Sequence, residues 1–129
     1  MSELARVILT DFIHDDLAPE HAVLDGVADV EALDATDESQ LVGRVDDADA
    51  LMVFHNLSIT RATIARLNKC RLIVRCGVGV DNIDHAFARQ RGIDVANVPD
   101  YGTEDVADSA IGGLLALSRG IHLYNARLQ

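Results

Sequence analysis

The sequence contains few cysteine, lysine and aromatic residues. Its 129 residues include two cysteines, one lysine (Lys69) and no tryptophan. Cys70 and Cys76 stand at the two ends of one expected strand, so they cannot easily bridge each other, and they lack the spacing and partners of a zinc site. A disulfide-rich secreted scaffold and a structural zinc domain are thereby disfavoured. We expect two reduced, partly buried thiols.

Long apolar runs and a leader segment are also missing. No uninterrupted apolar stretch reaches the ~18 residues that a membrane-spanning helix needs. The N-terminal stretch MSELARVILTDF carries an early acidic residue and neither a basic region nor a small-residue cleavage site. We therefore predict no signal peptide, no membrane partner and a cytoplasmic location. A hydrophobic content of 49% and a mean hydropathy of +0.13 fit one globular domain.

Positive charge is scarce. The formal net charge is -10 and the isoelectric point about 4.6, which disfavours a nucleic-acid or anionic-membrane surface. One lysine stands against ten arginines, and most acids are aspartate. Such a surface suits a protein dissolved in concentrated salt, where screening removes self-repulsion. A salt-loving source is one hypothesis, and an ordinary acidic surface encoded by a GC-rich genome is the alternative.

Apolar runs alternate with segments of helical pattern along the chain. We expect strands at residues 5–11, 30–33, 50–54, 72–75 and 93–97. Short helices are expected at residues 19–25 and 38–42, after an N-cap at Thr60, and between a cap at Asp84 and a stop at Gly92. Five such repeats predict an α/β fold with a doubly wound, parallel five-stranded sheet, flavodoxin-like or Rossmann-like. Ligands bind such sheets at the carboxyl ends of the strands, here residues 11–16, 55–58, 77–82 and 100–103.

The last segment has a different pattern. Residues 103–129 predict one long helix, with Thr103 as its N-cap and no residue that must interrupt it. Apolar residues fall on several sides, so we expect this helix to be buried between bodies. The pair Gly112 and Gly113 is compatible with a second backbone packing close to it. We interpret residues 1–102 as a ligand-binding domain and residues 103–129 as a connecting helix.

The stretch RCGVGVDNID, residues 75–84, places two glycines directly after a strand. A dinucleotide-binding turn, G-x-G-x-x-G, needs a third glycine where this chain has Asn82. The loop is therefore predicted to bind a small anion, above all a carboxylate, through the backbone amides of Gly77, Val78 and Gly79. Asp81 and Asn82 are expected to hold the turn rather than touch the ligand.

Residues 72–119 resemble the D-isomer-specific 2-hydroxyacid dehydrogenases. The motifs that carry the resemblance are GVGVDNID, GIDVANVP and EDVADS, and FHNLSIT, residues 54–60, extends it. The branch of the C-terminal binding proteins and their bacterial relatives is the most similar. The resemblance implies an NAD-dependent D-2-hydroxyacid dehydrogenase, which interconverts 2-keto and D-2-hydroxy acids, and identifies this chain as its substrate-binding part. The nucleotide-binding domain, with the catalytic Arg, acid and His, would lie outside this chain, so we expect no catalytic residue here and no activity from the fragment alone.

The resemblance also implies roles for single residues. Gly77, Val78 and Gly79 would bind the substrate carboxylate, with His55 and Asn56 at the same mouth, although His55 is equally explained as a surface histidine. Val106 corresponds to a position near the cofactor but offers only packing. Phe54 stands where phosphoglycerate-type members carry an arginine, which favours a smaller substrate without phosphate.

Other assignments are weaker. Tyr101 lies beside the expected cleft, where packing explains it better than chemistry. His14, Asp15 and Asp16 could suggest a metal ion, but consecutive polar residues in a loop are usually solvated, so no metal site is predicted.

Two further classes of protein share parts of this pattern. A phospho-receiver domain is disfavoured, because it needs an aspartate after the third strand and a lysine after the fifth, where this chain has His55 and Val98-Pro99. A non-catalytic dimerisation or protein-recruitment module, as in the C-terminal-binding-protein branch, remains open. For the enzyme and for the non-catalytic module alike, we expect a homodimer, with the long helix contributing to the partner surface. A G-x-G-x-x-G motif in coding sequence beyond Gln129 would favour the enzyme, and a stop codon there the module.

The salt hypothesis makes a prediction. If the acidic surface is adapted to concentrated salt, the thermal midpoint of unfolding will rise steadily from low to multimolar KCl, because screening weakens repulsion among carboxylates. Circular dichroism during heating measures it. An unchanged midpoint across that range rules the hypothesis out.

Overall fold

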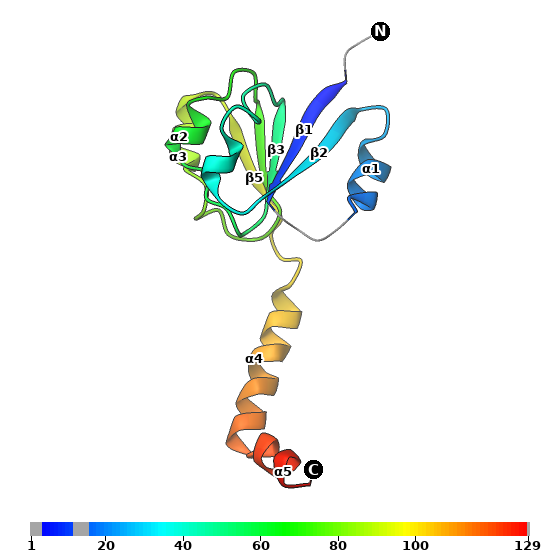
Figure 1. Cartoon of the computed structure of the whole chain (residues 1–129). Coiled ribbons are helices and arrows are strands. Elements are labelled where there is room, and N and C mark those ends of the chain that lie inside the picture. The colour runs from blue at the N-terminus through cyan, green and yellow to red at the C-terminus, as the bar shows by residue number, and fades with distance from the viewer. Residues whose placement is uncertain (1–3, 12–15, 129) are drawn as a thin grey trace. The chain divides into compact units, whose positions relative to one another are not determined.

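A five-stranded parallel sheet forms the centre of the first part of the chain. The computed structural model describes residues 4–11 and 16–128, without the side chain of Leu128. It divides after Pro99 into two compact units, which are considered separately below. The strands are β1 (Ala5–Asp11), β2 (Ala28–Ala35), β3 (Ala50–Val53), β4 (Leu72–Arg75) and β5 (Asp94–Asn97). Every pairing is parallel and the order is β2-β1-β3-β4-β5 (Figure 1). This is the flavodoxin-like order, and the predicted fold class is confirmed.

The strand boundaries follow the apolar runs closely. β1 and β4 have the predicted bounds. β2 is longer than the expected residues 30–33 and includes Asp29 and Glu31, which are exposed between partly buried neighbours. An edge strand alternates between a buried and a solvated side, so these polar residues interrupt the apolar pattern. The sequence therefore predicted a strand that is too short.

The helices of the first unit are short. They are α1 (Ala18–Leu24), the 3-10 helix η1 (Glu38–Leu41), α2 (Arg61–Ile64) and α3 (His85–Gln90). Both predicted caps are confirmed: the Thr60 hydroxyl accepts a hydrogen bond from Ala62 N at 3.2 Å, and the Asp84 carboxylate accepts one from Phe87 N at 3.0 Å. Gly92 follows α3 with φ +72°, a left-handed conformation that terminates helices.

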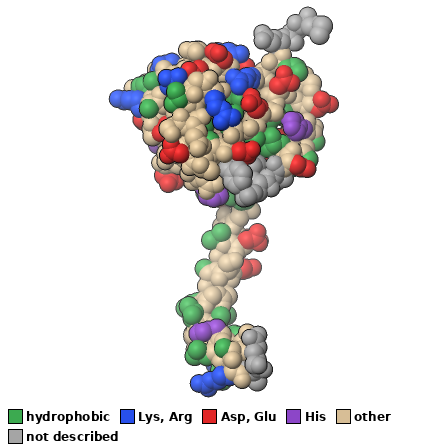
Figure 2. Space-filling view, in the orientation of Figure 1, with side chains coloured by type: hydrophobic (Ala, Val, Ile, Leu, Met, Phe, Trp, Pro, Cys, Tyr) green, Lys and Arg blue, Asp and Glu red, His purple; other side chains and the backbone are tan. Residues whose placement is uncertain are grey.

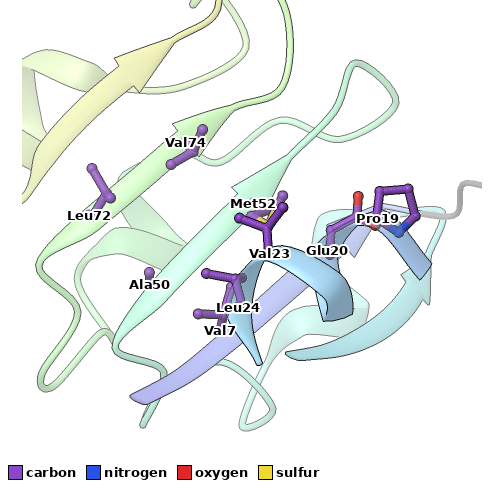
Figure 3. A pocket seen from close by; sticks show the side chains of 9 residues that line it. All are labelled: Val7, Pro19, Glu20, Val23, Leu24, Ala50, Met52, Leu72 and Val74. Atoms are coloured by element: carbon purple, nitrogen blue, oxygen red, sulfur yellow. The ribbon is translucent and has the colours of Figure 1, made fainter. Parts of the chain in front are cut away.

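The two faces of the sheet are covered unequally. Ile8, Leu51 and Ile73 lie side by side in register, are fully buried, and belong to one core cluster with residues of η1, α2 and α3. The alternate residues point to the other face, where α1 lies (Figure 1). No residue of α1 is buried. A groove of about 420 Å³ therefore remains between α1 and the sheet (Figure 3), lined by Val7, Pro19, Glu20, Val23, Leu24, Ala50, Met52, Leu72 and Val74.

The second unit consists of α4 (Thr103–Ser118) and α5 (Ile121–Leu128). The prediction of one continuous helix is wrong. Gly120 adopts φ +63° and ends the first helix, since glycine enters this conformation without steric cost. Thr103 is not the N-cap either: Gly102 holds that position, without a side-chain hydrogen bond to the helix.

Apolar side chains are exposed along both helices of the second unit (Figure 2). They are Val106, Ile111, Leu114, Leu115, Leu117, Ile121, Leu123 and Tyr124. No residue of α4 is buried within the described chain, so the expected burial between bodies is not seen here. Among the described helices, none is long and apolar enough to cross a membrane.

Candidate functional site

Two loops meet at the carboxyl ends of β3 and β4. Ile59 N donates to Asn82 O at 2.8 Å, and Asp84 N donates to Ile59 O at 3.0 Å. The Asn82 amide group donates to Phe54 O at 2.9 Å and to Leu57 O at 2.7 Å. Asn82 therefore holds the neighbouring loop from both sides of its tip.

The tip of that loop carries His55 and Asn56, both exposed. Asn82 is hydrogen-bonded to Phe54 and Leu57, which flank these two residues. It therefore holds the tip beside the glycine loop, residues 77–82. The structure thus groups five of the six residues predicted for the site, without establishing what they bind.

The buried carboxylate of Asp11 binds the backbone of the loop that follows β3. Asp11 ends β1, is fully buried, and accepts hydrogen bonds from the amides of Phe54, Asn56 and Leu57 at 3.0, 2.9 and 3.1 Å. The Thr10 hydroxyl adds a fourth at 2.8 Å. In this sheet order β1 and β3 flank the topological switch point, where doubly wound folds place their ligands. Sequence reasoning missed Asp11, although a lone acid closing the apolar run RVILTD was a visible signal.

In the glycine loop the carbonyl groups of Gly77 and Val78 are hydrogen-bonded, and the amides of Val78 and Gly79 are free. Gly77 O accepts from Val98 N at 3.0 Å, and Val78 O accepts from the Asn97 side-chain amide at 2.6 Å. The Gly77 amide is also used, donating to Arg75 O at 2.8 Å. Within the described chain, the amides of Val78 and Gly79 have no hydrogen-bond acceptor. The amides of Val80, Asp81 and Asn82 have none there either, so Val78 and Gly79 supply two of the donors that the loop offers to a ligand.

Side chains lie close to both glycines. A Cβ at Gly77 would meet the Arg75 guanidinium, and one at Gly79 would lie 2.7 Å from an Asp81 carboxylate oxygen, so a larger residue at either position would have to displace that side chain. Neither glycine has a positive φ. The Arg75 side chain folds over Gly77 and places a positive charge beside the loop.

Cys76 precedes the glycine loop but is poorly suited as a nucleophile. Burial raises the pKa of its thiol above the ordinary value, and burial does the same to the pKa of Cys70. Both cysteines are free and not exposed, as predicted. Since the thiolate is the reactive form, both remain protonated and unreactive near neutral pH.

Two further predicted positions belong to the second unit. Val106 is on α4 in the second unit and is 69% exposed, and Tyr101 precedes that helix and is also exposed. His14 and Asp15 are outside the described residues. Among those that are described, no group of three or more His, Cys, Asp or Glu side chains could hold a metal ion.

The described residues of the glycine loop and of the groove do not fit a dinucleotide. The position of the third glycine is occupied by Asn82, whose side chain is already bound to the neighbouring loop. The apolar groove of Figure 3 lies against the middle of the sheet rather than at its carboxyl edge, and Glu20 is the one charged residue among its described lining residues. Neither place offers the glycine-rich helix start that a pyrophosphate requires.

Comparison with known sequences assigns the chain to a family. The model of the D-isomer specific 2-hydroxyacid dehydrogenase catalytic domain matches residues 7–125. The D-3-phosphoglycerate dehydrogenase of Methanocaldococcus jannaschii is 35% identical over 126 residues, 98% of this chain and 24% of that protein. That of Mycobacterium tuberculosis is 36% identical over 118 residues, 91% of this chain and 22% of that protein. The chain thus spans about a quarter of the length of these relatives.

Solved structures agree in fold. A 2-hydroxyacid dehydrogenase from Ketogulonicigenium vulgare superposes with a TM-score of 0.75 and 34% identity, covering 96% of this chain and 39% of that one. D-Lactate dehydrogenase from Aquifex aeolicus, solved with NAD and lactic acid, gives 0.80 at 22% identity, covering 95% and 36%. The chain belongs to the D-isomer specific 2-hydroxyacid dehydrogenase family. The narrower resemblance to the C-terminal-binding-protein branch stays a prediction.

Removing the Asp11 carboxylate will destabilise the first unit. Asp11→Ala leaves three backbone amides without an acceptor, each costing about 1–3 kcal/mol if it stays buried, so we expect a loss of roughly 3–5 kcal/mol. Asp11→Asn keeps one carbonyl acceptor and should lose less. Urea unfolding followed by circular dichroism measures both. Asp29→Ala, an exposed aspartate on β2, is the control, with a change within about 0.5 kcal/mol. Equal losses for Asp11→Ala and Asp29→Ala would contradict this role.

The raised pKa of both thiols predicts slow alkylation. In the folded chain at neutral pH, iodoacetamide should react with Cys70 and Cys76 at least about tenfold more slowly than with glutathione, and the rate should rise only above the ordinary thiol pKa of about 8.5. Mass spectrometry over time measures the labelling. Unfolding in urea should restore the ordinary rate. Labelling of the folded chain as fast as that of glutathione would show that neither thiol is protected.

Proposed function

We propose that this chain is the substrate-binding part of an NAD-dependent oxidoreductase that interconverts 2-keto acids and D-2-hydroxy acids. Family membership supports the class of reaction. The observation that carries the proposal is the pair of free amides of Val78 and Gly79 at the carboxyl end of β4. Two adjacent free N–H donors are suited to a carboxylate, the group that all 2-hydroxy acids share.

The chemistry would be divided between this chain and polypeptide outside it. The described residues include no dinucleotide-binding turn, so NAD would be bound mainly elsewhere, together with the acid–base histidine and the arginine that polarises the carbonyl. This chain would hold the carboxylate and close one side of the cleft with the tip that bears His55 and Asn56. Val106 would contribute packing toward the cofactor at most. The isolated chain should then bind the acid without reducing it.

Phe54 favours a substrate without a phosphate group. Its backbone is fixed at both ends, since its amide donates to Asp11 and its carbonyl accepts from Asn82. An aromatic side chain at this fixed position cannot pair with a phosphate. The curated relatives named above are phosphoglycerate dehydrogenases, so this proposal separates the chain from them in substrate.

A second candidate, a non-catalytic dimerisation module, is favoured by the exposed apolar side chains of α4 and α5. In both cases the second unit would contribute to a homodimer, and the protein would be cytoplasmic. The two functions differ in one property: only the enzyme requires a carboxylate site at the glycine loop.

Carboxylate binding is tested by amide NMR spectra of the isotope-labelled chain. Titration with sodium pyruvate, with NaCl adjusted to constant ionic strength, should shift the Val78 and Gly79 signals and saturate. Neutral pyruvamide should shift them far less, and NADH should not move them. With pyruvate and NADH together, NADH absorbance should stay constant.

Gly79→Pro deletes one of the two donors and should weaken pyruvate binding about tenfold, the usual cost of one hydrogen bond to a charged group. Gly79→Ala, which adds the same Cβ beside Asp81 but keeps the amide, serves as the control. Pyruvate shifts confined to other parts of the chain, or equal shifts from pyruvamide, would refute the carboxylate site.

A further inference from the structure

We propose that Asn97 is a positioning residue that aims the Gly79 amide at the substrate carboxylate. This inference rests on the proposed function, because it presumes that the amides of Val78 and Gly79 bind an acid. It adds a residue from β5, a strand that supplied none of the predicted site residues.

The argument begins with the geometry of a single peptide group. The carbonyl of Val78 and the amide of Gly79 belong to one planar trans unit, so they point in opposite directions. The Asn97 side-chain amide donates to Val78 O at 2.6 Å. Fixing the carbonyl on one side therefore fixes the direction of the Gly79 N–H on the other.

The neighbouring peptide is held in the same way. Val98 N donates to Gly77 O at 3.0 Å, which fixes the Val78 N–H by the same planarity. The amides of Val78 and Gly79 are thus both oriented by residues at the end of β5. Of the two contacts, only that of Asn97 is made by a side chain, and so only this one varies with sequence.

The sheet register brings Asn97 to this place. β5 pairs with β4 so that Asn97 lies opposite Arg75, two residues before Gly77. The hydrogen bond spans 19 residues of sequence. An asparagine suits the position because it donates a hydrogen bond without adding charge, whereas aspartate would repel both the Val78 carbonyl and an incoming carboxylate.

Without this contact the Val78–Gly79 peptide has little else to orient it. Gly79 has no Cβ, so its backbone has more conformations open to it than any other residue. Val78 is itself half exposed, at 52%. Loss of the Asn97 hydrogen bond should leave the fold intact and the direction of one donor undefined.

The test compares pyruvate affinity, by the amide NMR titration described above, in the full 129-residue chain and three variants. Asn97→Ala and Asn97→Asp should each weaken binding about fivefold to tenfold, with the larger effect for Asn97→Asp because of its charge. Both should also change the Gly79 amide signal and its hydrogen-exchange rate before ligand is added. Asn68→Ala, which removes another exposed side-chain amide bonded to Asp47, should match the wild type.

The outcomes separate the two proposals. Wild-type affinity in both Asn97 variants, with normal pyruvate binding by the parent chain, overturns the role of Asn97 and leaves the carboxylate site standing. Absence of pyruvate binding in the parent chain overturns both. Unchanged spectra outside the loop identify a local effect, and a weakening in Asn68→Ala equal to that in Asn97→Ala would also refute the assignment.

Discussion

Hydrogen bonds to the carbonyl groups of the glycine loop determine which way its amides point. A planar peptide whose oxygen is bound has only one direction left for its N–H. In this chain the oxygens of Gly77 and Val78 are bound by Val98 and Asn97. In the adjacent loop, after β3, the amides rather than the carbonyl groups are fixed, because three of them donate hydrogen bonds to the Asp11 carboxylate. One loop has its amides bonded to an internal carboxylate, and in the other the amides of Val78 and Gly79 have no acceptor within the described chain.

An acidic protein that binds an anion needs such local donors. The net charge of -10 opposes the approach of a carboxylate, but charges farther away than about 10 Å are largely screened at ordinary ionic strength. Within that distance the loop offers two amides and the Arg75 guanidinium, folded over Gly77. Hydrogen bonds to an ionised group are about twice as strong as neutral ones. Short-range geometry therefore outweighs the overall charge.

Sequence patterns predicted what depends on neighbours in the chain. The apolar runs located all five strands, and Thr60, Asp84 and Gly92 marked helix ends correctly, because a cap involves residues a few positions apart. The glycine loop was also located from the sequence. The close approach of the Arg75 guanidinium to Gly77 was not, because it depends on the conformation of the Arg75 side chain. The roles of Asp11 and Asn97 were not predicted. Their hydrogen-bond partners lie 43–46 and 19 residues away in the sequence. These partners are backbone atoms, so no sequence motif indicates them. The break at Gly120 was missed because glycine within a helical pattern is often tolerated.

The most direct measurement is a crystal structure of the chain grown with both pyruvate and NAD. The account predicts the acid group within hydrogen-bonding distance of Val78 N and Gly79 N, with the loop carbonyls still bound by Asn97 and Val98. Density for the coenzyme's pyrophosphate against Gly77 and Gly79, with the acid group bound at another place, would contradict it.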